Sequence, residues 1–351
     1  MMKLIFILFF VVLLSHFKNA ILVCSSNFCG PTHQCVVTST NQLKCFGRNN
    51  VGQLGLGNTD HKGDNPSEMG DYLPFANILG SQISSFGAIS WHCSQTASLN
   101  VFCWGANDYG QLGQGDTTQR GSGSMELGVY LPPVPFSASF IVSQFDLGDL
   151  HGLILTDSQM VQGWGRDNVG QLGSGGSDHK GDAPSEMGEY LPFIQVDSLP
   201  TAPISQISSG GDSNCVLMEG DGSMRCWGYN GFGQLGVGHS NNIGDGGSEM
   251  GSYLQSVNLP SSISSISQIV SGKSMNGFIS ESGTLFVFGL NGFGYLGLGH
   301  AADIGNNPNE MGEYLQPTLF GSGRTALEVK GLLSFLSSIF NVTICFFFQY
   351  F

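Results

Sequence analysis

The chain has 351 residues, with 12 Lys plus Arg against 26 Asp plus Glu and a formal net charge of -14. Proteins that hold nucleic acid by its phosphates need clustered basic residues, so this balance argues against a nucleic-acid partner. The 52 glycines are about twice the usual share and fall at repeated offsets, which indicates turns and not a disordered tract.

The first segment, residues 1–20, has the pattern of a secretory signal peptide. Lys3 precedes an apolar run from Leu4 to Leu14, and polar residues follow it. This run is too short to span a bilayer comfortably. We therefore expect an extracellular protein, secreted or attached to the cell surface; the alternative for this segment is a buried strand.

Five copies of one motif follow, and they organise residues 21–330. The fourth copy reads CWGYNGFGQLG from Cys226, and the others begin at Cys45, Cys103, Gly163 and Val287. The ninth letter of successive copies recurs after 58, 60, 63 and 61 residues (Gln53, Gln111, Gln171, Gln234 and Tyr295). A period of this kind is typical of a repeat architecture.

Cysteines occur in pairs within three of these copies: Cys35 with Cys45, Cys93 with Cys103, and Cys215 with Cys226. In the other two copies we assign the same positions to Gly152 with Gly163 and to Gly277 with Val287, so both cysteines are present or both are absent. A separation of 10 or 11 residues suits opposite positions on a hairpin. We predict three disulfides; the alternative, free thiols in a reducing cell, does not require gain and loss in pairs.

Each period reads as four strands. The first alternates polar and apolar residues, as in Gln82 to Gly87; the next two form the cysteine hairpin; the fourth is expected at the Tyr-Leu-Pro sequence, as at Tyr72 to Pro74. Four short strands per period predict an all-β fold, a β-propeller of four-stranded blades with five blades visible. The chain begins with the last two strands of a period.

The end of the repeats contains the first two strands of a period, expected near Tyr314 to Phe320 and Ala326 to Val329. The two half periods could form one composite blade that closes the ring, or they could belong to a longer ring. The tail at residues 331–351 is apolar and has no charged residue. The tail has three possible interpretations. It could be a glycolipid-anchor signal or a transmembrane helix, and both imply membrane attachment. It could also be a segment that is foreign to a longer natural chain.

Two groups of residues have side chains that can bind metal ions. Asp64, Asp182 and Asp245 recur in acidic loops among glycines and carbonyl groups, which calcium can use. The D-x-[DN]-x-[DN]-G pattern is absent, and glutamates in these loops could equally bond backbone amides, so these aspartates are weak candidates.

The second group is His33, His92 and His151, each of which precedes a hairpin. We assign Asn214 and Asn276 to the same repeat position in the later copies. A ring of metal ligands would hardly tolerate that mixture, so we expect no metal there. The tryptophans Trp104, Trp164 and Trp227 are expected to pack the blades.

We find no nucleophile with a base and an orienting group, and no phosphate-binding loop followed by a helix. The sequence therefore predicts no catalytic residue, no cofactor and no enzyme activity. The loops after the GQLG turns vary most between copies, and they are the expected binding face.

The pattern CWGxNxxGQLG, with the preceding Ile-Ser-Ser-Gly and His-Cys elements, resembles the regulator of chromosome condensation repeat family over about residues 31–330. The resemblance implies a ring of blades, usually seven, each of four strands. It implies two kinds of function: the nuclear member is a guanine-nucleotide exchange factor for the small GTPase Ran and binds chromatin, whereas secreted members include a bacterial inhibitor that clamps β-lactamases.

No local motif places exchange residues at numbered positions of this chain. The leader, the cysteine pairs and the acidic charge favour the secreted, cysteine-containing kind. We expect a monomeric, non-enzymatic scaffold that binds an unidentified protein partner. The alternative is a guanine-nucleotide exchange or regulatory protein for a small GTPase of the Ran type.

Overall fold

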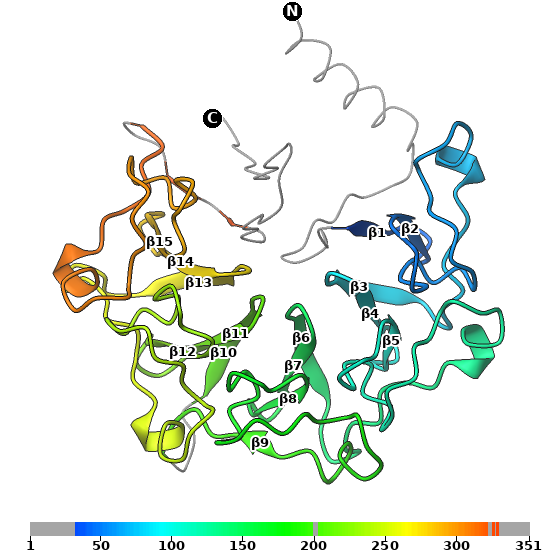
Figure 1. Cartoon of the computed structure of the whole chain (residues 1–351), viewed down its shortest axis with the longest axis horizontal. Coiled ribbons are helices and arrows are strands. Elements are labelled where there is room, and N and C mark those ends of the chain that lie inside the picture. The colour runs from blue at the N-terminus through cyan, green and yellow to red at the C-terminus, as the bar shows by residue number, and fades with distance from the viewer. Residues whose placement is uncertain (1–31, 199–202, 322–324, 327, 330–351) are drawn as a thin grey trace, which may run out of the picture. The chain divides into compact units, whose positions relative to one another are not determined.

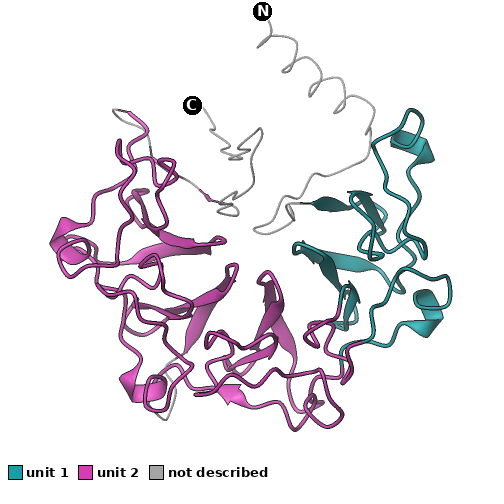
Figure 2. Ribbon diagram, in the orientation of Figure 1, with its two compact units in different colours: residues 1–106, 118–134 teal, residues 107–117, 135–351 magenta. Residues whose placement is uncertain are grey.

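The computed structural model describes residues 32–198, 203–321, 325–326 and 328–329. The expected signal peptide and the tail at residues 331–351 lie outside these residues. Two compact units are present, one of residues 1–106 and 118–134, the other of residues 107–117 and 135–351 (Figure 2). Within the described residues all strand ladders are antiparallel and the helices are single 3-10 turns.

The first unit contains two sheets (Figure 1). β1 (His33–Val37) pairs with β2 (Leu43–Gly47), which is the isolated hairpin expected at the start of the repeats. β3 (Gln82–Gly87), β4 (Trp91–Thr96) and β5 (Val101–Gly105) form the second sheet in that order. β1 contacts β3, so the two sheets pack side by side.

The second unit contains three sheets in chain order. Their strands are β6 (Val142–Leu147), β7 (His151–Thr156), β8 (Val161–Gly165) and β9 (Phe193–Ile194); β10 (Ile204–Ser209), β11 (Ser213–Met218) and β12 (Met224–Gly228); and β13 (Ile266–Ser271), β14 (Met275–Ser280) and β15 (Leu285–Gly289). β10 contacts both β6 and β13, which places the first strands of the three sheets next to one another (Figure 1). Each sheet corresponds to one predicted blade.

The prediction of a strand at Tyr-Leu-Pro is wrong. The tyrosines end 3-10 turns, namely η1 (Gly70–Tyr72), η2 (Gly128–Tyr130), η3 (Gly251–Tyr253) and η4 (Gly312–Tyr314). Gly70 opens its turn at a φ of 69°, outside the extended region. The tyrosine side chains are between 60% and 74% exposed, whereas the leucines that follow them are buried (Leu73, Leu131, Leu191, Leu254 and Leu315).

The fourth strand lies beyond these turns and is short. It is β9 in one sheet, and in two others it is reduced to a single bridge, from Lys44 to Phe75 and from Arg225 to Ser256. In the described part after β15 there is no strand, so the one expected near 314–320 is absent; the one expected near 326–329 includes residue 327, which lies outside the described residues. The repeat therefore has three regular strands and a variable fourth.

The three predicted cysteine pairs are disulfide bonded: Cys35 with Cys45, Cys93 with Cys103, and Cys215 with Cys226. The members of each pair lie opposite each other in their hairpins. In the sheet of β7 and β8, however, the residue opposite Gly163 is Leu153 and not Gly152. The position assigned to Gly152 was therefore wrong by one residue, whereas Gly277 does lie opposite Val287.

The motif glycines bring neighbouring copies into backbone contact. Gly110 has a φ of 73°, and a Cβ atom at this position would lie 2.2 Å from the backbone nitrogen of Asp182. A Cβ atom on Gly170 would likewise lie 2.4 Å from the backbone nitrogen of Asp245. A side chain has no room at either glycine. The acidic loops thus pack onto the motif of the preceding copy.

Candidate functional site

The glutamate of each acidic loop binds the backbone of its own loop. In the best-formed case, Oε2 of Glu126 accepts hydrogen bonds from the N–H groups of Gly121 at 2.8 Å, Ser122 at 2.9 Å and Gly123 at 2.9 Å. Burial alone would raise the pKa of Glu126, but these backbone hydrogen bonds hold it below its usual value. The other copies make the same kind of bond (Glu68, Glu186, Glu249 and Glu310).

The calcium candidates are dispersed and have protein partners. Asp64 accepts a hydrogen bond from the side chain of Asn65 at 3.0 Å, and Asp245 accepts one from Asn242 at 3.2 Å. Burial and the neighbouring Glu186 raise the pKa of Asp182. Among the described residues, none of these aspartates belongs to a group of three side chains close enough to share an ion. The acidic loops are explained by their hydrogen bonds, and the aspartates remain weak candidates.

Charged and aromatic side chains gather at one end of the three sheets of the second unit, in what we call the charged strip (Tyr109, Asp149, Arg166, Asp212 and Lys273). Asp149, Asp212 and Lys273 occupy the loops between the first and second strands of successive sheets. Arg166 follows β8 at the same end, because His151 at the start of β7 pairs with Gly165 at the end of β8.

Opposite charges in the strip lie close together. Nζ of Lys273 is 3.9 Å from Oδ2 of Asp149, and Nη1 of Arg166 is 3.7 Å from Oδ1 of Asp212. The guanidinium of Arg166 also lies over the ring of Tyr109, 5.4 Å from its centre. The four charged side chains are between 23% and 43% exposed, so they are accessible to a partner. The strip therefore presents both signs of charge and an aromatic ring to solvent.

Backbone hydrogen bonds connect the three loops of the strip. The N–H of Asp149 donates to the carbonyl of Gly211 at 3.0 Å, and the N–H of Gly211 donates to the carbonyl of Gly272 at 3.1 Å. Burial raises the pKa of Asp149 to about 6; Lys273 opposes this rise, and the negative charge of Asp212 adds to it. The loops are thus fixed to one another, and Asp149 is held in a site that disfavours its charge.

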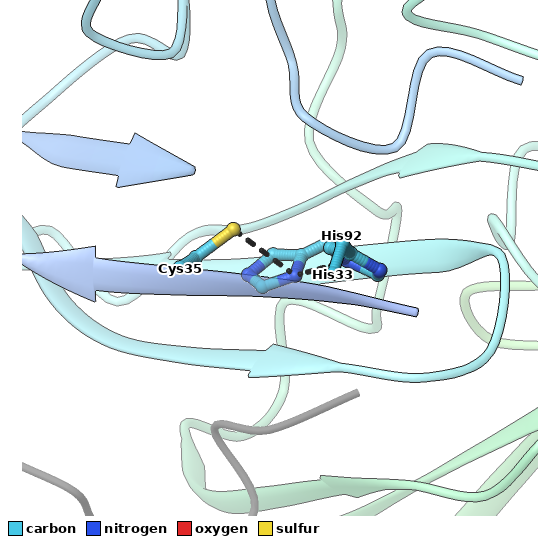
Figure 3. Close-up of side chains that lie close together, drawn as sticks. All are labelled: His33, Cys35 and His92. Carbon is cyan, nitrogen blue, oxygen red and sulfur yellow. Dashed lines mark hydrogen bonds between the residues drawn. The ribbon is translucent and has the colours of Figure 1, made fainter. Parts of the chain in front are cut away.

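A second cluster, in the first unit, combines two histidines and a cysteine (Figure 3). Nε2 of His33 on β1 is 3.1 Å from Nδ1 of His92 on β4, and Sγ of Cys35 is 3.5 Å from the same Nδ1. The three residues are at most 2% exposed. Burial lowers the pKa of His33 to about 4 and that of His92 well below its usual range, so both rings are neutral at pH 7.

This cluster was not predicted from the sequence, because the three histidines were assigned to one repeat position. In the structure His33 and His151 lie opposite the glycine that ends a strand, Gly47 and Gly165 respectively. His92 lies one residue further, opposite Trp104, at the position held by Asn214 and Asn276 in later copies (opposite Trp227 and Phe288). The signal available in the sequence was this offset of one residue.

The two histidine positions meet between neighbouring sheets. His33 contacts His92, His151 contacts Oδ1 of Asn214 at 2.9 Å, and Asn276 contacts Oγ of Ser213 at 3.4 Å. In each contact, the residue opposite the strand-ending glycine of one copy meets the residue opposite the Trp or Phe of the following copy. A pair of histidines occurs where the cysteine of β1 is also close.

The described residues contain no helix long and apolar enough to cross a membrane. Serine and histidine meet in the first unit, where Oγ of Ser85 contacts Nε2 of His92, but both residues are fully buried. A substrate could not reach this pair in the folded chain.

Two segments of the chain, residues 100–155 and 204–234, match family models described as the regulator of chromosome condensation (RCC1) repeat. The chain is 29% identical over 281 residues to the ultraviolet-B receptor UVR8 of Arabidopsis thaliana, a match that covers 78% of this chain and 55% of the receptor. The two segments therefore contain RCC1 repeats, and these matches support an RCC1 repeat β-propeller. It is also 33% identical over 207 residues to the probable E3 ubiquitin-protein ligase HERC4 of Rattus norvegicus, covering 58% of this chain and 17% of the ligase.

Solved structures agree with the RCC1 β-propeller fold that the sequence predicted. Human WBSCR16 superposes with a TM-score of 0.60 at 19% identity, over 86% of this chain and 68% of that one. Prp20p of Saccharomyces cerevisiae superposes with a TM-score of 0.58 at 14% identity, over 83% and 62%. At these identities the likeness shows the fold alone. The chain spans about half the length of UVR8 and less than a fifth of HERC4.

Proposed function

We propose that this RCC1 propeller is a non-enzymatic scaffold that binds another protein through the charged strip. The observation that carries the proposal is the run of paired charges and an aromatic ring across three consecutive sheets, on loops joined by backbone hydrogen bonds. Charged groups of both signs orient a protein partner, and an aromatic ring beside arginine is typical of the centre of an interface. Because hydrogen bonds already fix the loops, they lose little conformational entropy when a partner binds.

The names of two relatives, the ultraviolet-B receptor UVR8 and the probable E3 ubiquitin-protein ligase HERC4, support a regulatory or interaction role. The partner of this chain is to be sought outside the cell. Three disulfides within hairpins favour an oxidising compartment, where such bonds persist. The intact mass of the protein secreted by a eukaryotic host, before and after reduction and alkylation, tests the compartment. An unprocessed and fully reduced chain would contradict it.

The binding face is tested by charge reversal within the strip. The full chain, Lys273→Glu and Arg166→Glu are immobilised, and proteins of the extracellular medium and cell surface are captured and compared by mass spectrometry. We expect one partner to be retained by the unchanged chain and reduced at least about tenfold by either reversal. Glu281→Lys is the matched control, because Glu281 lies in the turn between β14 and β15, at the opposite end of the sheet.

A partner bound equally by all four proteins would overturn the assignment to the strip, and turnover that depends on one of the chain's own residues would overturn the non-enzymatic role. The alternative is guanine-nucleotide exchange on a small GTPase of the Ran type. The fold shared with Prp20p, which was studied for its binding to Gsp1p and histones, is the observation that favours it. Faster release of labelled GDP from such a GTPase, measured with the full chain, would support the alternative over the scaffold.

A further inference from the structure

The buried cluster of the first unit points to chemistry that the charged strip does not use. We propose that His33, His92, Cys35 and Cys45 form a latent site for a zinc-like divalent cation, which becomes available when the Cys35–Cys45 disulfide is reduced. Two thiolates and two imidazoles are a ligand set that zinc accepts in tetrahedral geometry. The site lies apart from the charged strip and does not depend on the scaffold function.

Two separations among the ligand atoms are close to those of a tetrahedral ion, and the ligand atoms of His33, Cys35 and His92 all lie within 4.8 Å of one another. With bonds of about 2.0–2.1 Å to nitrogen and about 2.3 Å to sulfur, two nitrogens would lie about 3.3 Å apart and a nitrogen and a sulfur about 3.6 Å apart. The observed separations are 3.1 Å between the imidazole nitrogens of His33 and His92, and 3.5 Å between Sγ of Cys35 and Nδ1 of His92. Little movement is therefore needed to bind a cation among these three atoms.

Neighbouring groups prepare the histidines for this role. Ser85 contacts Nε2 of His92, so a proton donated from Nε2 to Ser85 leaves the lone pair of Nδ1 toward the cluster. Gly87, at the end of β3, leaves space beside the same nitrogens. A Cβ atom on Gly87 would lie 3.0 Å from Nδ1 of His92 and 3.3 Å from Nε2 of His33. In the metal-free chain Nε2–H of His33 then donates to Nδ1 of His92, and Nε2 becomes a ligand when this proton moves to Nδ1 of His33, which has no hydrogen-bond partner among the described residues.

The redox step has a defined balance. A dithiol, from a small molecule or a redox protein, transfers two electrons and two protons to the Cys35–Cys45 bond and itself becomes a disulfide. The divalent cation then replaces the protons of the two thiols, and two protons are released. Cys35 and Cys45 join the paired strands β1 and β2, so reduction also frees the hairpin to open for entry.

The other copies show how to remove the ligands without disturbing the fold. Asn214 replaces the second histidine in the contact with His151, and Leu153 opposite Gly163 replaces a cysteine pair. His92→Asn and the double variant Cys35→Leu with Cys45→Gly therefore introduce combinations that the same chain already uses. His151→Asn is a control, since it changes a buried histidine outside the cluster.

The test is titration of the full chain with Co²⁺ after reduction by a phosphine, which does not leave a thiol to compete for metal. The reduced protein is expected to bind one more equivalent of cobalt than the double variant, with visible bands of tetrahedral cobalt and near-ultraviolet thiolate charge transfer. Addition of Zn²⁺ should remove these bands. His92→Asn should lower the affinity for this additional cobalt ion at least about 100-fold, because it removes a ligand and not only a supporting group.

The double variant keeps all other cysteines, so it measures the cobalt that they bind after reduction. His151→Asn should leave the spectrum unchanged, and the oxidised chain should lack the charge-transfer band. Equal cobalt uptake by the reduced chain and the double variant would overturn the proposal. So would a charge-transfer band that His92→Asn does not alter, with circular dichroism confirming that the variant is folded.

Discussion

Trp227 donates its indole Nε1–H to the backbone carbonyl of Gln171, 3.0 Å away and 56 residues earlier in the chain. The same bond joins Trp164 to Gln111 at 2.8 Å within the second unit. Each tryptophan belongs to one copy of the repeated motif, and each glutamine belongs to the copy before it. The motif is therefore a contact between consecutive copies as well as a local turn.

Trp227→Phe tests how much this contact contributes to stability. The change removes the indole donor and leaves a small cavity at a fully buried site, so we expect the free energy of unfolding to fall by about 1–3 kcal/mol. Phe288 occupies the corresponding position in the last sheet, so the fold accepts phenylalanine there. Denaturant unfolding measures the loss, and Tyr253→Phe, at a 64% exposed residue, should change stability by less than about 0.5 kcal/mol. Equal effects of the two variants would contradict the assigned role.

The sequence was sufficient to predict the repeat, its hairpins and its disulfides, because these depend on local alternation and on short separations along the chain. The fourth strand was misplaced since Tyr72-Leu73-Pro74 has the apolar composition of a strand. Its backbone is instead turned by Gly70 and leaves Tyr72 exposed. Composition does not reveal where a positive φ interrupts an extended segment.

The two candidate sites were harder to predict for a different reason. His33 and His92 meet only because two positions, one residue apart in register, face each other between neighbouring sheets. Asp149 and Lys273 are 124 positions apart in the numbering and come from different copies. Contacts between copies depend on how sheets pack, which the period of a repeat does not specify.

Gly110→Ala is expected to destabilise the second unit strongly. The new Cβ would lie 2.2 Å from the backbone nitrogen of Asp182, and the φ of 73° is unfavourable for alanine, so the neighbouring loop must move. We expect a loss of about 2–4 kcal/mol in denaturant unfolding. Gly220→Ala is the matched control, because a Cβ there meets no atom within 4 Å, and it should be neutral or slightly stabilising. A stable Gly110→Ala protein would show that the loop is not fixed by this contact.

The acidic loops should make stability depend on pH in acid. Hydrogen bonds from backbone amides lower the pKa of Glu68 to about 2 and lower that of Glu126. The unfolded chain then binds more protons than the folded chain between about pH 2 and 4.5, so stability is complete above this range and is lost as pH falls through it. Glu126→Gln should remove the contribution of Glu126 to the acid-dependent part of the free energy of unfolding, which is on the order of 0.5–1 kcal/mol after screening by solvent. Thermal melts from pH 2 to 6 measure this, and an unchanged acid slope in Glu126→Gln would be the contrary result.

Asp149 has the opposite effect on stability. Burial raises the pKa of Asp149 to about 6 from an ordinary value of 3.8, so the folded chain binds more protons than the unfolded chain between about pH 4 and 6. Stability should therefore fall as pH rises through this range, by up to about 3 kcal/mol at roughly 1.4 kcal/mol for each tenfold change in acidity. Asp149→Asn removes the titrating group and should be more stable than the unchanged chain at pH 7, with the two curves meeting near pH 4.

Denaturant unfolding at pH 4, 5, 6 and 7 distinguishes this expectation from a role for Asp149 as a stabilising partner of Lys273. In that case Asp149→Asn would be less stable at pH 7, and the difference would shrink toward acid. A carboxylate that destabilises its own fold beside an exposed lysine is more readily explained by binding than by folding, because stability is commonly lower where a surface is shaped for a partner. Greater stability of Asp149→Asn together with weaker capture of the partner would connect the two properties in one residue.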